Sequence, residues 1–327
     1  MNNVVVFGGA GFIGSHVVDE LCNRGNRVLV VDNLAAGSAE NLVNSPSDLL
    51  IADPTTDIGF IRVARDVQGF RPTHIIDLAA EPYIPDSYAS VDWSVGAFRS
   101  NVNLVTASAR IGLQNLRTLQ RYLYISTSEV YGSAVGMSHM DESHRLNPQS
   151  TYAVSKLAAE RLIVNWYFEH GLPAVILRQF NTYGPRSTHP YVIPHIITQM
   201  SKPERVVRLG DISVERDFLY VTDAATRIVD SLFGNLDLGD VYNSGYGDTY
   251  SIGAIFNVLH NIVCLSESVH LIPNYKPQLR PNDVKRLLCC SDKLCGRIGY
   301  PPLVSLGDGL QRTYEYFTQR GKWLWEK

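Results

Sequence analysis

The chain has 327 residues, of which 45% are hydrophobic and 19% charged, the composition of an ordinary globular enzyme with one large domain or two. Its formal net charge of -3 gives no overall attraction to nucleic acid or to an anionic membrane, so neither is an expected partner. The polar start Met1-Asn2-Asn3 lacks the basic segment and apolar core of a signal peptide, and the apolar run after it is too short to span a membrane.

The cysteines are an odd number, and they lack the paired C-x-x-C spacing of a zinc site. Unpaired thiols are typical of a reducing compartment. We therefore expect a cytoplasmic protein with no metal site. The five residues are Cys22, Cys264, Cys289, Cys290 and Cys295.

A β-branched run at residues 4–7 is followed at once by the glycine-rich segment Gly8-Gly-Ala-Gly-Phe-Ile-Gly14 and then by a helical pattern of apolar residues. Strand, glycine turn and helix form the context of a dinucleotide-binding loop. Glycines with this spacing allow a tight turn and let backbone N–H groups and the helix N-terminus approach a pyrophosphate. The residues assigned to the cofactor are Gly8, Gly11, Phe12, Ile13 and Gly14.

The next two expected strands, residues 27–31 and 49–52, each end at an aspartate. Asp32 follows the first, where a carboxylate accepts hydrogen bonds from the adenosine ribose hydroxyls. Asn33 comes next rather than an arginine that would pair with a 2′-phosphate, which favours NAD over NADP. Asp53 follows the second strand and either contacts the adenine or orders its own loop.

A fourth strand at residues 74–78 precedes small residues that let the chain pass close to the cofactor. Helical stretches at residues 58–70 and 95–111 alternate with these strands. The alternation predicts a Rossmann-type, doubly wound parallel sheet in the α/β class. The cofactor-contacting residues expected here are Leu78, Ala79 and Ala80.

A fifth strand, residues 121–125, opens onto hydroxyl and carboxylate side chains, and a helix begins near Ser150. Tyr152 and Lys156 are four residues apart on that helix and so share one face. A lysine cation near a phenol favours the phenolate and lowers its pKa from the usual value of about 10. The pair is therefore typical of a general base that takes a proton from an alcohol while a bound nicotinamide takes the hydride, with both residues also beside the cofactor.

Beyond the sixth strand, residues 174–177, the alternation becomes irregular. We expect an NAD-binding domain of residues 1–180 with a returning segment at about 211–243, and a smaller, mixed and discontinuous substrate domain of residues 181–327. Short strands are expected in this irregular part at residues 206–209, 241–243 and 268–272, with a returning helix at 221–232 and a terminal helix at 307–317.

Motifs along nearly the whole chain are those of one enzyme family. They are Gly8-Gly-Ala-Gly-Phe-Ile-Gly14, Asp32, Asp77-Leu-Ala-Ala80, Ser126-Thr-Ser-Glu-Val-Tyr-Gly132, Tyr152-x-x-x-Lys156, Arg178-Gln-Phe-Asn-Thr-Tyr-Gly-Pro185 and Arg216-Asp-Phe-Leu-Tyr-Val-Thr-Asp223. On these motifs the chain resembles an extended short-chain dehydrogenase/reductase of the NAD-dependent nucleotide-sugar epimerase, dehydratase and decarboxylase family.

The resemblance implies a nucleotide-diphosphate sugar as the substrate. It implies that Asn181 contacts the diphosphate and that Arg216 and Arg280 grip the nucleotide. An arginine fork suits phosphate oxygens because it donates two parallel hydrogen bonds.

The resemblance also implies a shared first step, in which Tyr152 as phenolate removes the sugar O4 proton while C4 gives a hydride to NAD⁺. In a 4,6-dehydratase a base then removes the C5 proton, water leaves from C6 and the hydride returns there, and Glu129 suits that base. In a 4-epimerase the ketosugar takes the hydride back on its other face, which leaves Glu129 no evident task. In a UDP-glucuronate decarboxylase the oxidised sugar is a β-keto acid that loses CO₂.

The residue before Glu129 bears on this choice. Family members that act on dTDP-glucose carry Asp-Glu at this place, whereas this chain has Ser128-Glu129, which resembles GDP-mannose-type dehydratases and the decarboxylases. The segment at residues 80–87 resembles that of dehydratases. We therefore predict a 4,6-dehydratase, with a 4-epimerase or decarboxylase as the alternative. The candidate catalytic residues are Thr127, Ser128, Glu129, Tyr152 and Lys156.

The family also implies a homodimer, paired through the helices at residues 95–111 and 152–168. A non-catalytic NAD-binding regulator on the same fold is disfavoured by the intact Tyr152 and Lys156, because a cofactor sensor has no need of a general base.

Overall fold

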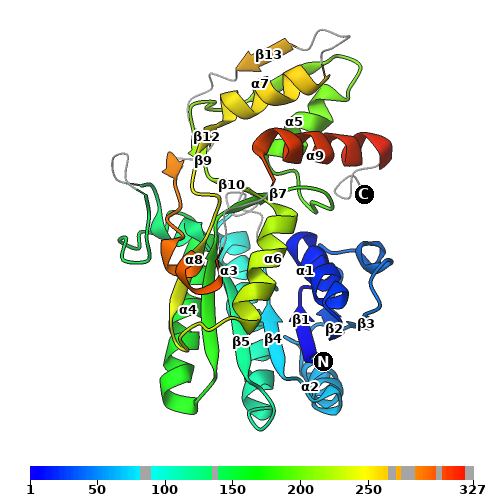
Figure 1. The fold of residues 1–327 in the computed structure, drawn as a ribbon, viewed down its shortest axis with the longest axis vertical. Coiled ribbons are helices and arrows are strands. Elements are labelled where there is room, and N and C mark those ends of the chain that lie inside the picture. The colour runs from blue at the N-terminus through cyan, green and yellow to red at the C-terminus, as the bar shows by residue number, and fades with distance from the viewer. Residues whose placement is uncertain (82–89, 135–138, 264–269, 274–283, 300–303, 321–327) are drawn as a thin grey trace.

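The computed structural model describes residues 1–81, 90–134, 139–263, 270–273, 284–299 and 304–320. Figure 1 shows a large sheet in its lower half and a group of helices beyond the end of the sheet opposite to the N-terminus. Among the described helices, none combines the length with the apolar character that crossing a bilayer requires. Two residues of interest in the sequence, Cys264 and Arg280, lie outside the described residues.

The large sheet has seven strands, all parallel, in the order β11-β6-β5-β4-β1-β2-β3. This confirms the predicted doubly wound parallel sheet. The expected strand at residues 241–243, which ends the expected returning segment, is the seventh strand of this sheet, because it pairs with β6. The strands are β1 (Asn3–Phe7), β2 (Arg27–Asp32), β3 (Asp48–Ile51), β4 (His74–Asp77), β5 (Arg121–Thr127), β6 (Ala174–Gln179) and β11 (Val241–Ser244).

Both faces of this sheet are buried, and alternate residues of β1 pack into the cores on opposite faces. Val4 and Val6 belong to the core on one face, while Val5 and Phe7 belong to the core on the other. Such two-sided burial is why these strands are nearly continuous apolar runs. Helices α1 (Phe12–Asn23), α6 (Val221–Phe233) and α8 (Asp292–Ile298) cover the first face, and α2 (Asp57–Phe70), α3 (Val91–Gln114) and α4 (Thr151–His170) cover the second.

Helix ends are set by local side chains. The Ser150 side chain accepts a hydrogen bond from Ala153 N at the start of α4, which ends at Gly171 with φ of 71°. The Ser90 side chain accepts from Trp93 N in the same way, so that α3 begins four residues before the expected residue 95.

A second hydrophobic core holds the helices drawn at the top of Figure 1. Helices α5 (Val192–Met200), α7 (Ile252–Val263) and α9 (Leu306–Arg320) belong to this part, which also contains β8 (Val206–Leu209) paired with β13 (His270–Pro273). Short strands connect it to the large sheet. They are β7 (Asn181–Tyr183), β9 (Glu215–Arg216), β10 (Phe218–Tyr220), β12 (Tyr250–Ser251) and β14 (Arg286–Leu287).

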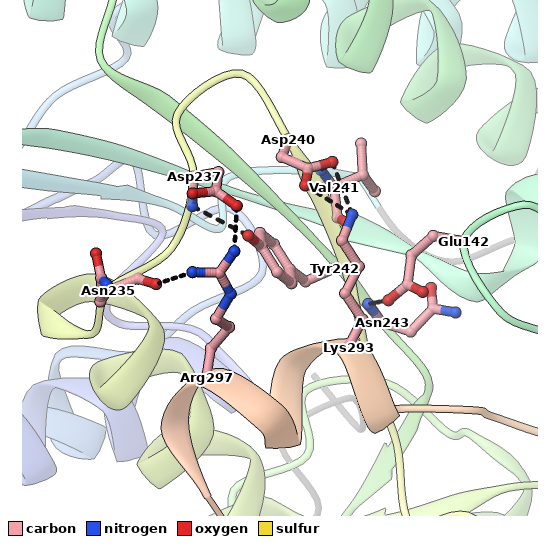
Figure 2. Close-up of polar contacts among 9 residues, drawn as sticks. All are labelled: Glu142, Asn235, Asp237, Asp240, Val241, Tyr242, Asn243, Lys293 and Arg297. Carbon is pink, nitrogen blue, oxygen red and sulfur yellow. Dashed lines mark hydrogen bonds and ion pairs between the residues drawn. The ribbon is translucent and has the colours of Figure 1, made fainter.

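The exposed edge of β11 is closed by polar contacts, which Figure 2 shows. Glu142 Oε1 accepts a hydrogen bond from Asn243 N at 2.6 Å, which satisfies an outward-facing amide of the edge strand. Lys293 of α8 pairs with Asp240 at 2.7 Å, and Arg297 pairs with Asp237 at 2.5 Å. The last strand and α8 are thereby held together.

Candidate functional site

The glycine-rich turn after β1 is packed too tightly for other residues. Gly8 has φ of 76°, and a Cβ on Gly14 would lie 2.1 Å from Gly8 O. Gly11 is the N-cap residue of α1, and no side chain hydrogen-bonds to the first amides of this helix. The first helical turn begins with Phe12 and Ile13 and contains no acidic residue. The helix N-terminus therefore offers its amides and its positive dipole to an anion, as the pyrophosphate of a dinucleotide requires.

Asp32 joins β2 to this turn. Its carboxylate accepts hydrogen bonds from Ala10 N (3.0 Å) and Leu34 N (2.8 Å), and burial raises its pKa while these two bonds oppose the rise. A carboxylate oxygen accepts more than one hydrogen bond, so both retain capacity for the hydroxyls of a ribose. Asn33 beside it is exposed and accepts from Ala35 N at 3.0 Å.

Of the two roles expected for Asp53, the structure shows the ordering of a loop. Its Oδ1 accepts hydrogen bonds from Thr55 N at 2.9 Å and from the Thr55 hydroxyl at 2.7 Å. Contact with an adenine remains a prediction.

The chain passes close to the glycine turn after β4. Ala79 N lies 2.9 Å from the position that a Cβ on Gly8 would take, and Leu78 N donates to Phe7 O at 3.0 Å. Ala80 follows in the same half-buried stretch. The two segments therefore pack backbone against backbone at the ends of β1 and β4.

Asp77, at the end of β4, is a residue whose role the sequence analysis missed. It is fully buried, and it accepts hydrogen bonds from Ser108 Oγ, from the Tyr122 hydroxyl (2.8 Å) and from Ala79 N (3.0 Å). Its charge also acts on Lys156, whose pKa it raises. A charged residue inside the apolar run 74–78 was the signal that could have revealed it.

The candidate catalytic residues come together where β5, a short 3₁₀ helix (η3, Ser128–Tyr131) and α4 meet. Thr127 caps η3 by accepting from Glu129 N at 3.2 Å, and its side chain also hydrogen-bonds the phenol of Tyr152. Ser128 is buried and Glu129 is half-buried at the start of η3. The fold thus brings the element that carries this carboxylate into contact with the helix of the expected base.

Electrostatics at Tyr152 differ from the expectation. Burial raises the pKa of Tyr152 above its ordinary value and the Glu129 charge raises it further, while the hydrogen bond with Thr127 lowers it. The predicted lowering by Lys156 is not found, because the Lys156 ammonium donates to Ile125 O at 2.6 Å and lies 4.2 Å from the centre of the Tyr124 ring. Burial lowers the pKa of Lys156 to about 8, although the charges of Asp77 and Glu160 raise it.

An ion pair behind these residues fixes their positions. Glu160, one turn after Lys156 on α4, receives two hydrogen bonds from Arg178 of β6 (3.0 and 2.7 Å) and one from Ser126 of β5 (2.6 Å). Arg178 also donates to the Tyr131 hydroxyl at 2.8 Å, which donates to Asn243 at 2.7 Å. All of these side chains are buried.

The expected substrate residues lie on the short connecting strands. Asn181 begins β7 and pairs in register with Phe218, two residues after Arg216, so the residue predicted to contact the diphosphate and one predicted to grip the nucleotide are on neighbouring segments. The Asn181 side-chain oxygen is buried and has no hydrogen-bond partner among the described residues. Because this oxygen only accepts hydrogen bonds, a contact between Asn181 and a diphosphate would use the side-chain nitrogen as the donor. Arg216 is 8% exposed.

Comparisons with known proteins agree with these motifs. The family model described as GDP-mannose 4,6 dehydratase matches residues 5–313. A dTDP-glucose 4,6-dehydratase of Actinoplanes sp. is 29% identical, over 98% of this chain and 99% of its own length. UDP-glucuronic acid decarboxylase 1 of Arabidopsis thaliana is also 29% identical, over 97% of this chain and 70% of its own length.

Two solved structures are similar over nearly their whole length. The dTDP-glucose 4,6-dehydratase DesIV of Streptomyces venezuelae, crystallised with NAD bound, superposes with a TM-score of 0.86 at 28% identity and covers 98% of each chain. The UDP-glucose 4-epimerase of Thermotoga maritima, crystallised with UDP-glucose, superposes with a TM-score of 0.85 at 28% identity, covering 98% of this chain and all of the other.

The close packing of the glycine turn predicts the effect of Gly14→Ala. The new Cβ would lie 2.1 Å from Gly8 O, so the turn must shift. We expect NAD affinity, measured by calorimetry, to fall at least about 10-fold and stability to fall by about 1–3 kcal/mol. Gly69→Ala in α2 is the control, because its Cβ meets nothing within 4 Å and alanine favours a helix. Equal NAD affinity in the two variants contradicts the assignment of the turn to the cofactor.

The Asp77 network predicts a shifted pH profile in Asp77→Asn. Removing the charge lowers the pKa of Lys156 below its value of about 8, so the ammonium is lost at lower pH. We expect the alkaline limb of the pH profile of NAD reduction to move to lower pH. Tyr122→Phe, which removes a hydrogen bond to Asp77 but keeps the charge, should leave that limb in place. A limb that moves in Tyr122→Phe as far as in Asp77→Asn contradicts the electrostatic explanation.

Proposed function

The chain belongs to the GDP-mannose 4,6-dehydratase family, and we propose that it is an NAD-dependent nucleotide-sugar 4,6-dehydratase, a lyase. The observation that carries the proposal is the position of Glu129 in η3, which contacts α4, the helix that carries Tyr152. The charge of Glu129 also raises the pKa of the Tyr152 phenol. A dehydratase needs one group for the proton at O4 and a second for the proton at C5 of the same sugar. Tyr152 and Glu129 supply two such groups on two elements that contact each other.

The residues that would hold NAD are those of the glycine turn, Asp32, and the close approach at Leu78, Ala79 and Ala80. NAD supplies the acceptor for the C4 hydride and the donor that returns it at C6. The structural features that fit it are the N-terminus of α1, which has no side-chain cap, and the tight glycine turn, in which Gly8 packs directly against the backbone at Ala79.

The protein's own groups move the protons. Tyr152 accepts the O4 proton, and Thr127 is placed to stabilise the resulting phenolate through its hydrogen bond. The carboxylate of Glu129 removes the C5 proton, which the C4 ketone has made acidic. Ser128 beside it is a buried, neutral hydroxyl that donates a hydrogen bond to the departing C6 oxygen but holds no acidic proton of its own. The protonated Glu129 is then the group that can return a proton to the leaving hydroxyl.

The identity of the nucleotide and of the sugar is supported less directly than the reaction. Asn181 and Arg216 suit a diphosphate, and Arg280, outside the described residues, completes the proposed set. Dehydratase relatives named for dTDP-glucose are 26–29% identical. Because Ser128 stands where the resemblance expects an aspartate for that substrate, we propose a nucleotide-diphosphate sugar without restricting the base.

The alternative reaction with a specific observation in its favour is decarboxylation. The Arabidopsis relative named UDP-glucuronic acid decarboxylase is as similar in sequence as the first dehydratase, and decarboxylation needs no acid at position 128. A 4-epimerase shares the fold. The three reactions differ in the mass of their product, which makes them easy to separate.

We propose that residues 1–180, with a returning segment of about 211–243, form the NAD-binding domain, and that residues 181–327 form the remaining nucleotide-sugar domain. The pairing of β11 with β6 and the packing of α6 beside α1 support the returning segment.

A cytoplasmic location is proposed as well. It is supported by the described cysteines Cys22, Cys289, Cys290 and Cys295, none of which forms a disulfide with another described residue.

We also propose a homodimer formed through α3 and α4. These neighbouring helices expose large apolar side chains, among them Val91 (78% exposed) and Val95 (42%) on α3 and Val154 (43%) and Phe168 (76%) on α4. Apolar side chains on two adjacent helices are suited to pair with the same surface of a second copy.

The dehydratase proposal predicts a split phenotype in Glu129→Gln. The variant should still oxidise C4, seen as transient NADH absorbance, but lose water elimination by a factor of about 100 or more. Products from UDP-, GDP-, CDP- and dTDP-sugars are analysed by mass spectrometry, where loss of about 18 mass units reports dehydration, loss of about 44 decarboxylation, and no change epimerisation. Glu169→Gln, the same exchange at the exposed end of α4, is the control. Normal water loss by Glu129→Gln overturns the assignment.

The proposed dimer predicts that Val154→Glu places a charge in the interface and yields a monomer in analytical ultracentrifugation, whereas the wild type sediments as a dimer. Ile58→Glu on α2, where the side chain is 83% exposed outside the proposed interface, should remain dimeric. A monomeric wild type, or dimers in both variants, contradicts this interface.

A further inference from the structure

A buried carboxylate lies directly after Arg216, where the connecting strands meet the end of the large sheet. Asp217 is fully buried, and its Oδ1 accepts a hydrogen bond from Tyr246 N at 2.6 Å. Its Oδ2 accepts from Gly247 N at 2.8 Å and from Cys289 N at 3.2 Å. One side chain thus holds the backbone of two segments that are about 40 residues apart in the sequence.

The surrounding residues are arranged to let these segments converge. A Cβ on Gly245 would lie 2.5 Å from Cys289 Cβ and 3.0 Å from Asp217 Oδ1, so only glycine fits there. Arg227 of α6 is 3% exposed and donates to Gly245 O at 2.6 Å. We call Asp217, Arg227, Gly245 and Cys289 the Asp217 junction.

The junction joins elements with different tasks. Residues 245–247 leave β11, the last strand of the large sheet, and Arg227 belongs to a helix that packs on that sheet. Cys289 follows β14, which pairs with β9, the strand that carries Arg216. The Asp217 junction therefore sets where the Arg216 strand lies relative to the sheet that carries the cofactor residues.

The direction of the neighbouring side chain follows from strand geometry. Glu215 N donates to Lys285 O and Asp217 N donates to Leu287 O, so the chain is paired and extended through these residues. Successive side chains of an extended chain point to opposite sides. With Asp217 held in the junction, Arg216 is turned to the other side of the strand, and its guanidinium donates to Glu215 O at 3.0 Å.

Burial of the Asp217 carboxylate in its charged form is energetically unfavourable. Burial raises the pKa of Asp217 to about 7, although three backbone amides and the Arg227 cation oppose the rise. An asparagine would avoid the cost of burying a charge but could not accept at both ends of its side chain. A carboxyl group that accepts through both oxygens therefore matches the three backbone amides that meet here.

From these contacts we propose that Asp217 is a positioning residue for substrate binding, which orients Arg216 toward the nucleotide diphosphate by fixing its strand to the end of the large sheet. This inference rests on the proposed function, since it assigns Arg216 to the diphosphate. Asp217 itself touches no substrate. Its replacement should therefore weaken nucleotide binding through Arg216 while leaving the cofactor turn unchanged.

The test measures binding directly. UDP, GDP, CDP and dTDP are titrated by calorimetry into the NAD-loaded wild type, and the best ligand is then used with the variants. We expect its dissociation constant to rise at least about 10-fold in Asp217→Asn and in Gly245→Ala, which disturb the Asp217 junction from opposite sides, while that of NAD changes less than about 2-fold. Asp248→Asn, which alters an exposed carboxylate nearby, should bind like the wild type.

A double-mutant cycle separates positioning from general loosening. If Asp217 acts through Arg216, then Asp217→Asn adds little to the loss of affinity already caused by Arg216→Ala, whereas independent effects would add. Additive losses, a parallel loss of NAD affinity, or unchanged nucleotide affinity in Asp217→Asn each overturn the inference. A wild type that binds none of the four diphosphates instead overturns the proposed function on which it rests.

Discussion

The arrangement of the candidate site depends on the buried ion pair between Glu160 and Arg178. The two side chains are 2% and 4% exposed, and together with Ser126, Tyr131 and Asn243 they form one hydrogen-bonded chain across α4, β5, η3, β6 and β11. A buried pair of this kind adds little net stability compared with apolar residues, but loss of one partner leaves an uncompensated charge that costs about 3–5 kcal/mol. Its contribution is geometric: it holds the helix of Tyr152 and Lys156 at a set distance from the short helix of Glu129.

Much of the fold was predictable because parallel strands buried on both faces are apolar runs that end in polar or glycine-rich turns. Strands β1 to β6 lie where these runs predicted them, and Ser150 and Gly171 show why α4 begins and ends where it does. The pairing of the seventh strand was harder to predict, because Val241–Ser244 is short and follows a long excursion through the connecting strands. Its partner β6 is more than 60 residues away in the sequence, and local patterns do not carry information about such a pairing.

The sequence predicted which residues form the candidate site better than it predicted their pKa values. The i, i+4 spacing of Tyr152 and Lys156 correctly puts both on α4, but spacing does not say where a flexible lysine directs its ammonium. The structure turns it to Ile125 O, with Asp77 behind it, and leaves the Tyr152 phenol under the influence of Glu129. Burial and charges brought in from other strands decide such pKa values, and these contacts exist only in the folded chain.

The different faces of helix α4 have different roles. One face presents Tyr152 and Lys156, another buries Ala159 and Ile163 against the sheet, Glu160 is fixed in its ion pair, and Val154 and Phe168 are exposed beside α3. The positions on this helix that are left free to vary are exposed ones such as Arg161, Asn165 and Glu169. New substrate preferences in related chains should therefore arise in the connecting strands and loops around β7, β9 and β14, while the buried positions of α4 change slowly.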